Sequence, residues 1–305
     1  MNKLTKEILD YLVDKYEEVT GKKMQFDDAM NSEQKQYYFK NLEDNLIEEM
    51  SETTIRQYKV GDGNELEEKM RAIRSSSAMT YNLLGNTDVT IKEENEFFTP
   101  GVYNVVFEKQ LRTIKRSPRK ANLDALLESE QELIFCEMKM TEWLFNKPGL
   151  VSENYLDEGH YFDKESYEAF YKMAQKIITN EVTDYRSYYG CLQQYDGVQM
   201  FKHLLGVYNY VMQEDKGMHK KVRLVNCVWE LPDMDVLSEK CKEIYFEKLE
   251  LEKKEFQEFY EAAQPVIKLF QEKGIEFDIC LLTFKEMLDV IEKNDTQKKF
   301  LERYL

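Results

Sequence analysis

Two short apolar segments, residues 122–129 (NLDALLES) and 132–139 (ELIFCEMK), constrain most strongly what this chain can fold into. Both have the length of a typical β-strand and are bounded by polar residues. A loop centred on Glu130 and Gln131 joins them. Because so short a connection leaves no room for a crossover helix, the pattern predicts an antiparallel hairpin in which Asp124 faces Glu137.

Charged residues interrupt both segments at positions that share one face of this hairpin. Side chains alternate along a strand, so Asp124, Glu137 and Lys139 should project together. The opposite face should carry Leu123, Ala125, Ile134, Cys136 and Met138. Like charges on directly opposed residues destabilise a hairpin unless something neutralises them. Two carboxylates suit Mg²⁺, for which Mn²⁺ can substitute, so the pattern predicts a divalent cation site.

Lys139, beside such an ion, would orient or deprotonate a water molecule and stabilise negative charge developing on phosphorus. The plainer alternative is an ion pair on a solvated strand face, which contributes about 0–1 kcal/mol. Both segments lie among apolar residues, as central strands do. This context favours the functional interpretation.

Length and composition set the class of protein. The chain has 305 residues, of which 42% are hydrophobic, so it can bury a sizeable core. No apolar run approaches the length of a membrane-spanning helix, and the acidic amphipathic start lacks a signal-peptide core. These features predict a globular, cytoplasmic protein. The five cysteines form no CxxC pair, so buried free thiols are expected rather than a zinc site.

The formal net charge of −16 argues against a nonspecific grip on nucleic acid. Any site for a polyanion must therefore be a local basic patch. The loop before residue 122 offers one, and it holds Arg112, Lys115, Arg116, Arg119 and Lys120. A basic loop beside the strand expected to hold the metal would bind a phosphate backbone. The alternative is a charge run that is merely solvated.

Apolar residues at helical spacing cover residues 4–57, 64–84, 163–213 and 236–273. In the first range the spacing includes Tyr38, Leu42, Leu46 and Met50. Residues 101–114, 221–232 and 275–284 instead indicate strands, with a further helix from residue 285. Because strands and helices intermingle from about residue 60 onward, we expect one compact α/β domain over residues 58–305, preceded by a helical layer over residues 1–57.

The segments LDALLES and FCEMK resemble the signature of the PD-(D/E)XK nuclease superfamily, which has the restriction-endonuclease-like fold. Here Leu-Asp stands in place of Pro-Asp, and Glu137-Met138-Lys139 is the ExK. More narrowly, GDGNELEEKMRAIRSSSAMTYNLLG, VVFEKQL, ANLDALLE, CEMKMTE and QYDGVQMFKHLLGVYN are similar, in that order, to a group of bacterial restriction-endonuclease-like proteins. The resemblance covers about residues 58–290 and leaves residues 1–57 outside it.

The resemblance implies a mixed central sheet flanked by helices, with the N-terminal helical region added to it. It also implies that Asp124 and Glu137 hold Mg²⁺ and that Lys139 positions the nucleophilic water. The superfamily often places a further acid on the helix before the sheet. Glu65 is favoured for this role and Glu108 competes, while an exposed acid in a first helical turn is the alternative for Glu65.

Superfamily nucleases of the recombination type carry a glutamine and an aromatic residue one helical turn apart after the ExK strand. Gln199 and His203 stand at positions i and i+4, so both would lie on one helix face and Gln199 would join the catalytic set. Alternatively, this helix simply packs its apolar stripe on the sheet and leaves Gln199 and His203 in water.

The residues and the resemblance together predict a Mg²⁺-dependent phosphodiesterase, an endo- or exodeoxyribonuclease acting on DNA. The alternative is a catalytically inactive member, a scaffold whose acidic surface recruits a basic protein. A small-molecule hydrolase is the weakest reading because the chain has no nucleophile elbow and no Gly-rich phosphate loop.

Overall fold

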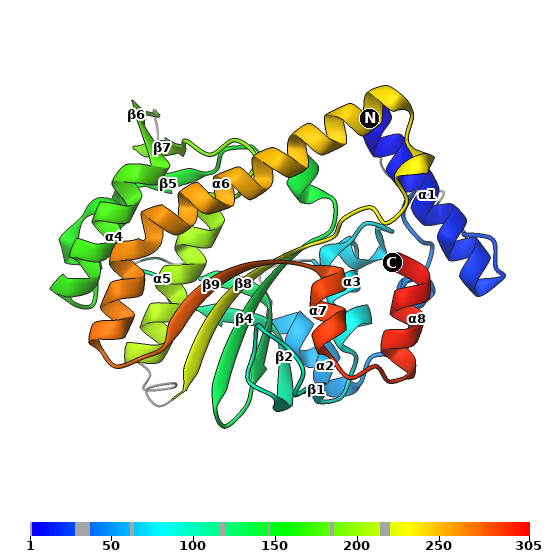
Figure 1. The fold of residues 1–305 in the computed structure, drawn as a ribbon, viewed down its shortest axis with the longest axis horizontal. Helices are drawn as coiled ribbons and strands as arrows, with labels where there is room; N and C mark the ends of the chain where they lie inside the picture. The colour runs from blue at the N-terminus through cyan, green and yellow to red at the C-terminus, as the bar shows by residue number, and fades with distance from the viewer. Residues whose placement is uncertain are drawn as a thin grey trace.

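The computed structural model describes residues 2–27, 37–61, 64–115, 117, 120–145, 147–183, 186–213 and 220–305. Its centre is a curled sheet of six strands in the order β1-β2-β3-β4-β8-β9 (Figure 1). These strands are β1 (Val89–Ile91), β2 (Gly101–Leu111), β3 (Ala121–Glu128), β4 (Glu132–Lys139), β8 (Lys221–Val228) and β9 (Phe277–Thr283). The first four are antiparallel neighbours, whereas β8 and β9 run parallel to β4. The expected α/β class with a mixed central sheet flanked by helices is confirmed.

Helices cover both faces of the sheet. On one face lie α4 (Lys164–Ile177), α5 (Gly197–Gln213) and the C-terminal half of α6 (Glu239–Glu272), packed in one core cluster with the sheet. A second cluster on the other face includes α1 (Lys3–Thr20), α3 (Ser76–Leu84), α7 (Phe284–Val290) and α8 (Asp295–Tyr304). Helix α2 (Glu52–Val60) packs against β2. The predicted N-terminal helices therefore share a core with the sheet.

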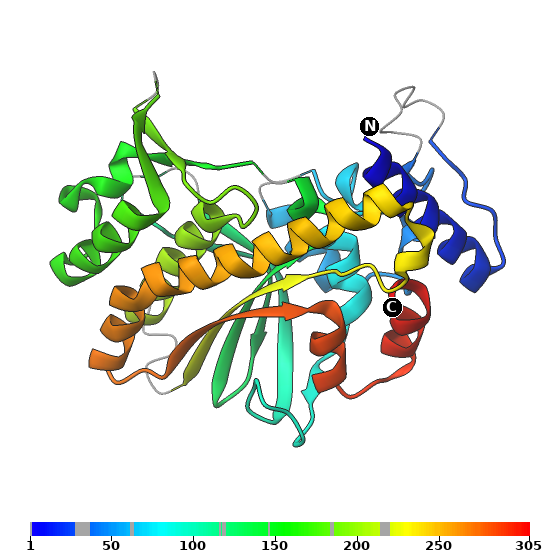
Figure 2. The same ribbon diagram turned by 45° about the horizontal axis from the view of Figure 1, so that its top comes forward.

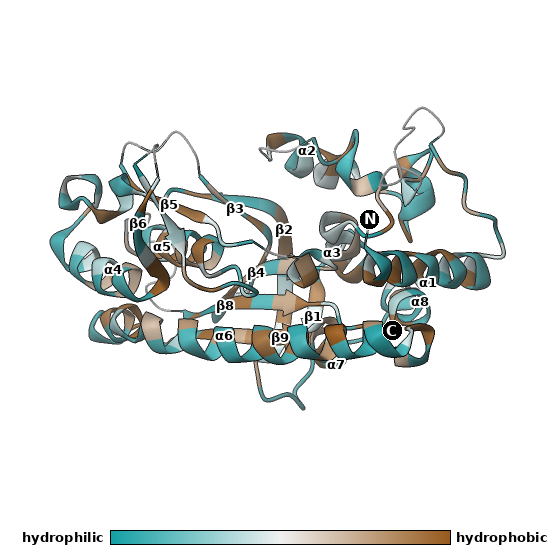
Figure 3. Ribbon diagram, turned by 90° about the horizontal axis from the view of Figure 1, so that it is seen from above, coloured by the Kyte–Doolittle hydropathy of each residue, from teal (hydrophilic) through white to brown (hydrophobic). Residues whose placement is uncertain are grey.

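Helix α6 joins the two halves of the molecule. It runs along the sheet from α1 to α4, as Figure 2 shows, and contacts both helices. Cys241 and Tyr245 near its start belong to the cluster of α1, while Phe259 and Phe270 belong to that of α4 and α5. Seen from above, hydrophilic and hydrophobic residues alternate along it (Figure 3). Its length confirms the long helix predicted over residues 236–273.

A second, small sheet interrupts the range 163–213, which was predicted to be helical. It contains β5 (Leu150–Ser152), β6 (Ile178–Val182) and β7 (Ser187–Gly190) in the antiparallel order β5-β7-β6. The prediction is wrong for β6 and β7 because α4 ends at Ile177 and the chain turns back on itself. Those two strands are too short and too exposed to show the alternation of apolar and polar residues that predicts a strand.

Two further helix predictions are wrong in part. Around Tyr38 to Met50 the chain forms only a short 3₁₀ turn (Leu42–Asn45), because the buried Asn45 amide donates to the carbonyls of Met70 (2.7 Å) and Ala72 (2.9 Å). Those tertiary hydrogen bonds override local propensity. Within residues 64–84, the chain forms a short 3₁₀ helix (Lys69–Arg71), and an α-helix begins only at α3, where the Ser75 hydroxyl caps it by accepting the Ala78 N–H (3.2 Å).

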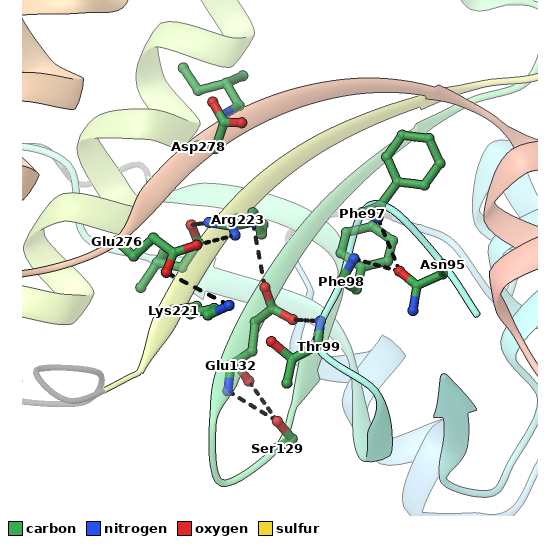
Figure 4. Close-up of polar contacts among 12 residues, drawn as sticks. Asn95, Phe97, Phe98, Thr99, Ser129, Glu132, Lys221, Arg223, Glu276 and Asp278 are labelled. Carbon is green, nitrogen blue, oxygen red and sulfur yellow. Dashed lines mark hydrogen bonds and ion pairs between the residues drawn. The ribbon is translucent and has the colours of Figure 1, made fainter. Parts of the chain in front are cut away.

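The predicted hairpin and its register are confirmed. Strands β3 and β4 pair from Ala125 opposite Cys136 to Glu128 opposite Leu133. The far end of the hairpin is held by the buried Glu132, whose carboxylate accepts the Thr99 N–H (2.7 Å) and lies 3.5 Å from Arg223 Nε (Figure 4). A fixed turn end keeps Asp124 and Glu137 in register at the open end.

A kink between β2 and β3 changes one prediction about the strand faces. The pairing runs from Phe107 with Ala125 to Lys109 with Leu123 and skips Glu108 and Asp124 between them. Glu108 adopts a left-handed backbone conformation, with φ of 52°. Leu123 consequently packs on the α5 side of the sheet, while Ala125 packs on the α3 side. The prediction that Leu123 shares a face with Ala125 is wrong because the kink rotates the strand between them.

The five cysteines are free, and Cys136, Cys227 and Cys241 are buried. Among the described helices, none combines the length and the apolar character needed to cross a membrane.

Candidate active site

The open end of the β3–β4 hairpin brings Asp124, Glu137 and Lys139 together. Asp124 lies at the kink, and its Oδ2 accepts the backbone N–H of Met138 on the neighbouring strand (2.7 Å). Glu137 and Lys139 lie on β4, two residues apart on one face, with Lys139 Nζ 2.7 Å from Glu137 Oε1. The register expected from the sequence is the reason that these three groups meet.

All three residues line one cleft with a volume of about 460 Å³. Its lining also includes Glu65, Glu108 and Glu142, so five acids face this space. Lys69, Arg74 and Lys139 are the basic residues among the described lining. A cleft with more acids than bases attracts cations, and it is where the predicted metal site would have to be.

Helix α5 supplies the partners of Glu137. The Gln199 amide donates from Nε2 to Glu137 Oε1 (2.8 Å) and accepts Lys139 Nζ at its own oxygen (2.6 Å). His203, one turn further along α5, places Nε2 3.0 Å from Glu137 Oε2. Both side chains therefore point toward β4 rather than into water. The alternative in which α5 leaves Gln199 and His203 in solvent is wrong, because the His203 side chain is only 3% exposed.

Burial and crowding perturb the acids strongly. Burial raises the pKa of Asp124 well above its usual range, and the neighbouring Glu137 and Glu108 raise it further. Burial, followed by the charge of Glu65, raises the pKa of Glu108 to about 7. Burial alone would also raise the pKa of Glu137, but Lys139 and His203 outweigh it and lower this pKa to about 2. Lys139 and His203 thus favour the carboxylate form of Glu137, whereas burial favours the protonated forms of Asp124 and Glu108.

Lys139 is the cation paired with this carboxylate. Burial disfavours its charge, yet Glu137 outweighs burial and raises the pKa of the ammonium above its ordinary value. The side chain is 17% exposed and lines the cleft, so it is both paired and reachable.

Glu65 and Glu108, the two candidates for a further acid, both line the cleft. Glu65 lies on a turn rather than on a helix, and its carboxylate contacts Lys69 Nζ (2.8 Å) and the Ser77 hydroxyl (2.9 Å). Glu108 accepts the Asn122 side-chain amide. A Cβ atom at Gly61 would lie only 2.8 Å from Glu108 Oε2, so glycine leaves room for this carboxylate. The expectation that Glu65 lies on a helix is wrong because α3 begins eleven residues later.

The described part of the basic loop lies outside the cleft. Arg112 and Lys115 lie over the ring of Phe162, at 5.1 and 6.0 Å from its centroid. Lys120 is exposed and donates to Gln110 Oε1 (3.1 Å). Arg116 and Arg119 lie outside the described residues. None of Arg112, Lys115 and Lys120 lines the acidic cleft, so they do not form part of its wall.

Several cleft residues were not singled out from the sequence. Asn122 contacts Glu108, and Lys69 contacts Glu65. Asn122 lies two residues before Asp124, so the alternation of side chains along a strand could have placed both on one face. No local pattern pointed to Lys69, because its role depends on a turn that the helical spacing concealed.

The residues present suit a hard divalent cation in their chemistry. Glu65, Glu108, Asp124 and Glu137 bring oxygen donors to one cleft, and the Glu137 carboxylate is already faced by Lys139 and His203. No three of the described His, Cys, Asp and Glu side chains converge closely enough to hold an ion by themselves. Mg²⁺ does not require this, because it usually keeps several waters and binds through one or two carboxylates. The donor set therefore fits Mg²⁺, without a complete protein cage.

A mixed sheet flanked by helices, with acids and a lysine at its central hairpin, is compatible with the restriction-endonuclease-like class. The model of the family described as "Restriction Endonuclease associating with ARP" matches residues 9–305. Because this match covers nearly the whole chain, the protein belongs to that family. The match also includes most of residues 1–57, which the resemblance left out. No curated protein and no solved structure matches the chain.

Proposed function

We propose that the protein is a Mg²⁺-dependent nuclease that hydrolyses phosphodiester bonds in DNA. The observation that carries the proposal is the cluster of Asp124, Glu137 and Lys139 in one acidic cleft, at the register expected for the ExK hairpin. Membership of a restriction-endonuclease family supports the same class of activity.

In this proposal Asp124 and Glu137 hold the metal, with Glu65 or Glu108 as a further acid. Bound there, Mg²⁺ would supply positive charge to a nonbridging phosphate oxygen. Lys139 donates a hydrogen bond that orients the attacking water and stabilises charge developing on phosphorus. Its raised pKa supports this donor role over that of a base. Gln199, which touches both Glu137 and Lys139, keeps the pair in position.

The hydrolysis balances without any other reactant. A P–O bond forms to the water oxygen, the P–O bond to the leaving sugar oxygen breaks, and that oxygen takes up a proton. The phosphate backbone on either side needs positive charge, for which we propose Arg112, Lys115, Arg116, Arg119 and Lys120. The family description names association with ARP, and we propose that this chain also works beside such a partner, in the cytoplasm.

The test is cleavage of plasmid, linear duplex and single-stranded DNA by the purified protein with Mg²⁺ or Mn²⁺. We expect cleavage, and we expect Lys139→Ala to slow it by about 10²–10³-fold, the usual effect of losing a donor to developing charge. Lys139→Gln, which keeps a hydrogen-bond donor to Glu137, serves if the alanine variant does not fold. Lys298→Ala on α8 is the matched control.

Two results would contradict the proposal. One is a folded Lys139→Ala variant that cleaves as fast as the control. The other is a wild-type protein that neither cleaves DNA nor binds Mn²⁺ in calorimetry, which would favour the inactive scaffold instead.

A further inference from the structure

A second cavity lies beside the acidic cleft and has the opposite chemistry. It has a volume of about 520 Å³ and lies between the segment after β2, the small sheet and α5. Besides Lys120 and Lys202, the polar lining consists of hydroxyl and amide side chains, which are those of Thr113, Ser117, Ser152, Asn154, Tyr155 and Ser187. No Asp or Glu occurs among its described lining residues. In a chain with 58 acids and a net charge of −16, a cavity with two lysines and no acid suits an anion.

This cavity lies next to the acidic cleft at two elements, β3 and α5, each of which lines both spaces. On β3, Ala121 lines the cavity and the next residue, Asn122, lines the cleft. On α5, Gln199 lines the cleft and Lys202 lines the cavity. Three residues advance a helix by about 4.5 Å, so the two spaces are close neighbours. One extended polyanion spanning both spaces is therefore the arrangement to test.

The wall of the cavity is anchored from several sides. The Thr113 and Tyr155 hydroxyls lie 3.1 Å apart, and the Asn209 amide donates to the carbonyls of Arg112 (3.0 Å) and Thr113. Lys202 Nζ donates to Leu150 O (3.1 Å), which ties α5 to the small sheet. These contacts hold Arg112 and Thr113 in place, so a ligand would meet a preformed surface there.

The donors fit a sugar–phosphate backbone rather than bases. Hydroxyl, amide and ammonium groups are the usual partners of phosphate and sugar oxygens. The one aromatic residue among the described lining, Tyr155, is only 8% exposed, so it offers no open face for stacking a base. Contacts of this kind position a strand without reading its sequence.

We infer that this cavity binds the phosphodiester backbone of the substrate strand next to the scissile phosphate, with Lys120 and Lys202 as the cationic contacts. The inference rests on the proposed function. It places the point where the substrate DNA strand leaves the acidic cleft. A substrate must then continue past the scissile phosphate on this side.

Binding without cleavage tests the inference. Fluorescence anisotropy would follow a labelled single-stranded and a labelled duplex oligonucleotide in EDTA, over a series of salt concentrations, with the full chain. Lys120→Ala/Lys202→Ala should weaken binding about tenfold and reduce the slope of log K against log salt by about 0.7–0.9 per lysine. Lys120→Arg/Lys202→Arg, which keeps both charges, should restore binding. Lys298→Ala is the control, and thermal melts establish that each variant is folded.

The outcomes separate this inference from the proposed function. Unchanged affinity and slope in the folded alanine double variant, or no binding by the wild type, would overturn the inference. If the wild type cleaves and only Lys139→Ala stops it, the proposed function survives that result. The third outcome is that the wild type binds the oligonucleotide without cleaving it and that the alanine double variant binds it more weakly. In that case the cavity stands as a nucleic-acid site and the hydrolytic proposal falls.

Discussion

Glu65 and Glu108 differ in how their charges are compensated, and this difference bears on which of them would help to hold a cation. The sequence favours Glu65 by analogy. The contacts favour Glu108. Glu65 is already paired with Lys69 and accepts the Ser77 hydroxyl, whereas among the described residues Glu108 accepts only the Asn122 amide, and its pKa is raised to about 7. Burial, followed by the charge of Glu65, raises this pKa, and a bound cation would offset both effects.

We therefore expect Glu108→Gln to weaken Mn²⁺ binding about tenfold or more, and Glu65→Gln to weaken it less. Both substitutions keep the size of the side chain and remove only the charge. Isothermal titration calorimetry of the two variants side by side measures the difference. Equal loss in both would mean that the two acids act together, and a larger loss in Glu65→Gln would reverse the assignment.

At the scale of one element, α6 carries an acid whose place in the core is unusual. Glu252 is 1% exposed, and its Oε2 has no hydrogen-bond partner among the described residues. It lines a small cavity of about 110 Å³ that also touches Lys139. Burial, then Glu255 and Asp196, raise its pKa from 4.5 to about 8. Between these two pH values, the folded protein therefore keeps a proton on Glu252 that the unfolded chain has released.

The sign of the pH dependence follows from this proton. Between the unfolded value near 4.5 and the folded value of about 8, the folded state binds more protons, so stability falls as pH rises through this window. Glu252→Gln cannot ionise, and we expect its stability relative to the wild type to be greater near pH 9 than near pH 5. Urea unfolding at both pH values measures this, with the exposed Glu250→Gln on the same helix as control. If the free energy of unfolding of wild type and Glu252→Gln changed by the same amount between pH 5 and pH 9, the expectation would be refuted.

At the scale of the whole molecule, the acidic cleft couples stability to divalent cations. A ligand that binds only the folded state stabilises it by about 2.7 kcal/mol at a hundredfold excess over its Kd. We expect Mg²⁺ or Mn²⁺ to raise the melting temperature in differential scanning fluorimetry, and EDTA to reverse the rise.

Asp124→Asn is the matched control for this experiment. Its amide oxygen can still accept the Met138 N–H, so the fold should be retained while the metal ligand is lost. The variant should melt at a temperature that the ions do not change. An equal rise in wild type and variant would place the cation elsewhere.

Much of the central hairpin could be predicted from the sequence, because the information is local. Two apolar segments joined by two residues favour one pairing register, and that register places Asp124 and Glu137 at the same end of the hairpin, next to the pair of Ala125 and Cys136. The long helix α6 is likewise a local pattern. The wrong predictions concern residues whose conformation depends on distant partners: Asn45 bonds the carbonyls of Met70 and Ala72, and Leu123 changes face because of a kink shared with β2.

The amino-acid sequence by itself determined the α/β class, the hairpin and the placement of two acids and a lysine on it. Only the tertiary structure decided what surrounds them: Gln199 and His203 turn toward Glu137, Glu65 and Glu108 line the same cleft, and beside it opens a cavity with no acid among its described lining. The physical reason is the distance along the chain between the residues that interact. Hairpin register depends on neighbours along the chain, whereas burial and charge compensation depend on side chains that only folding brings together.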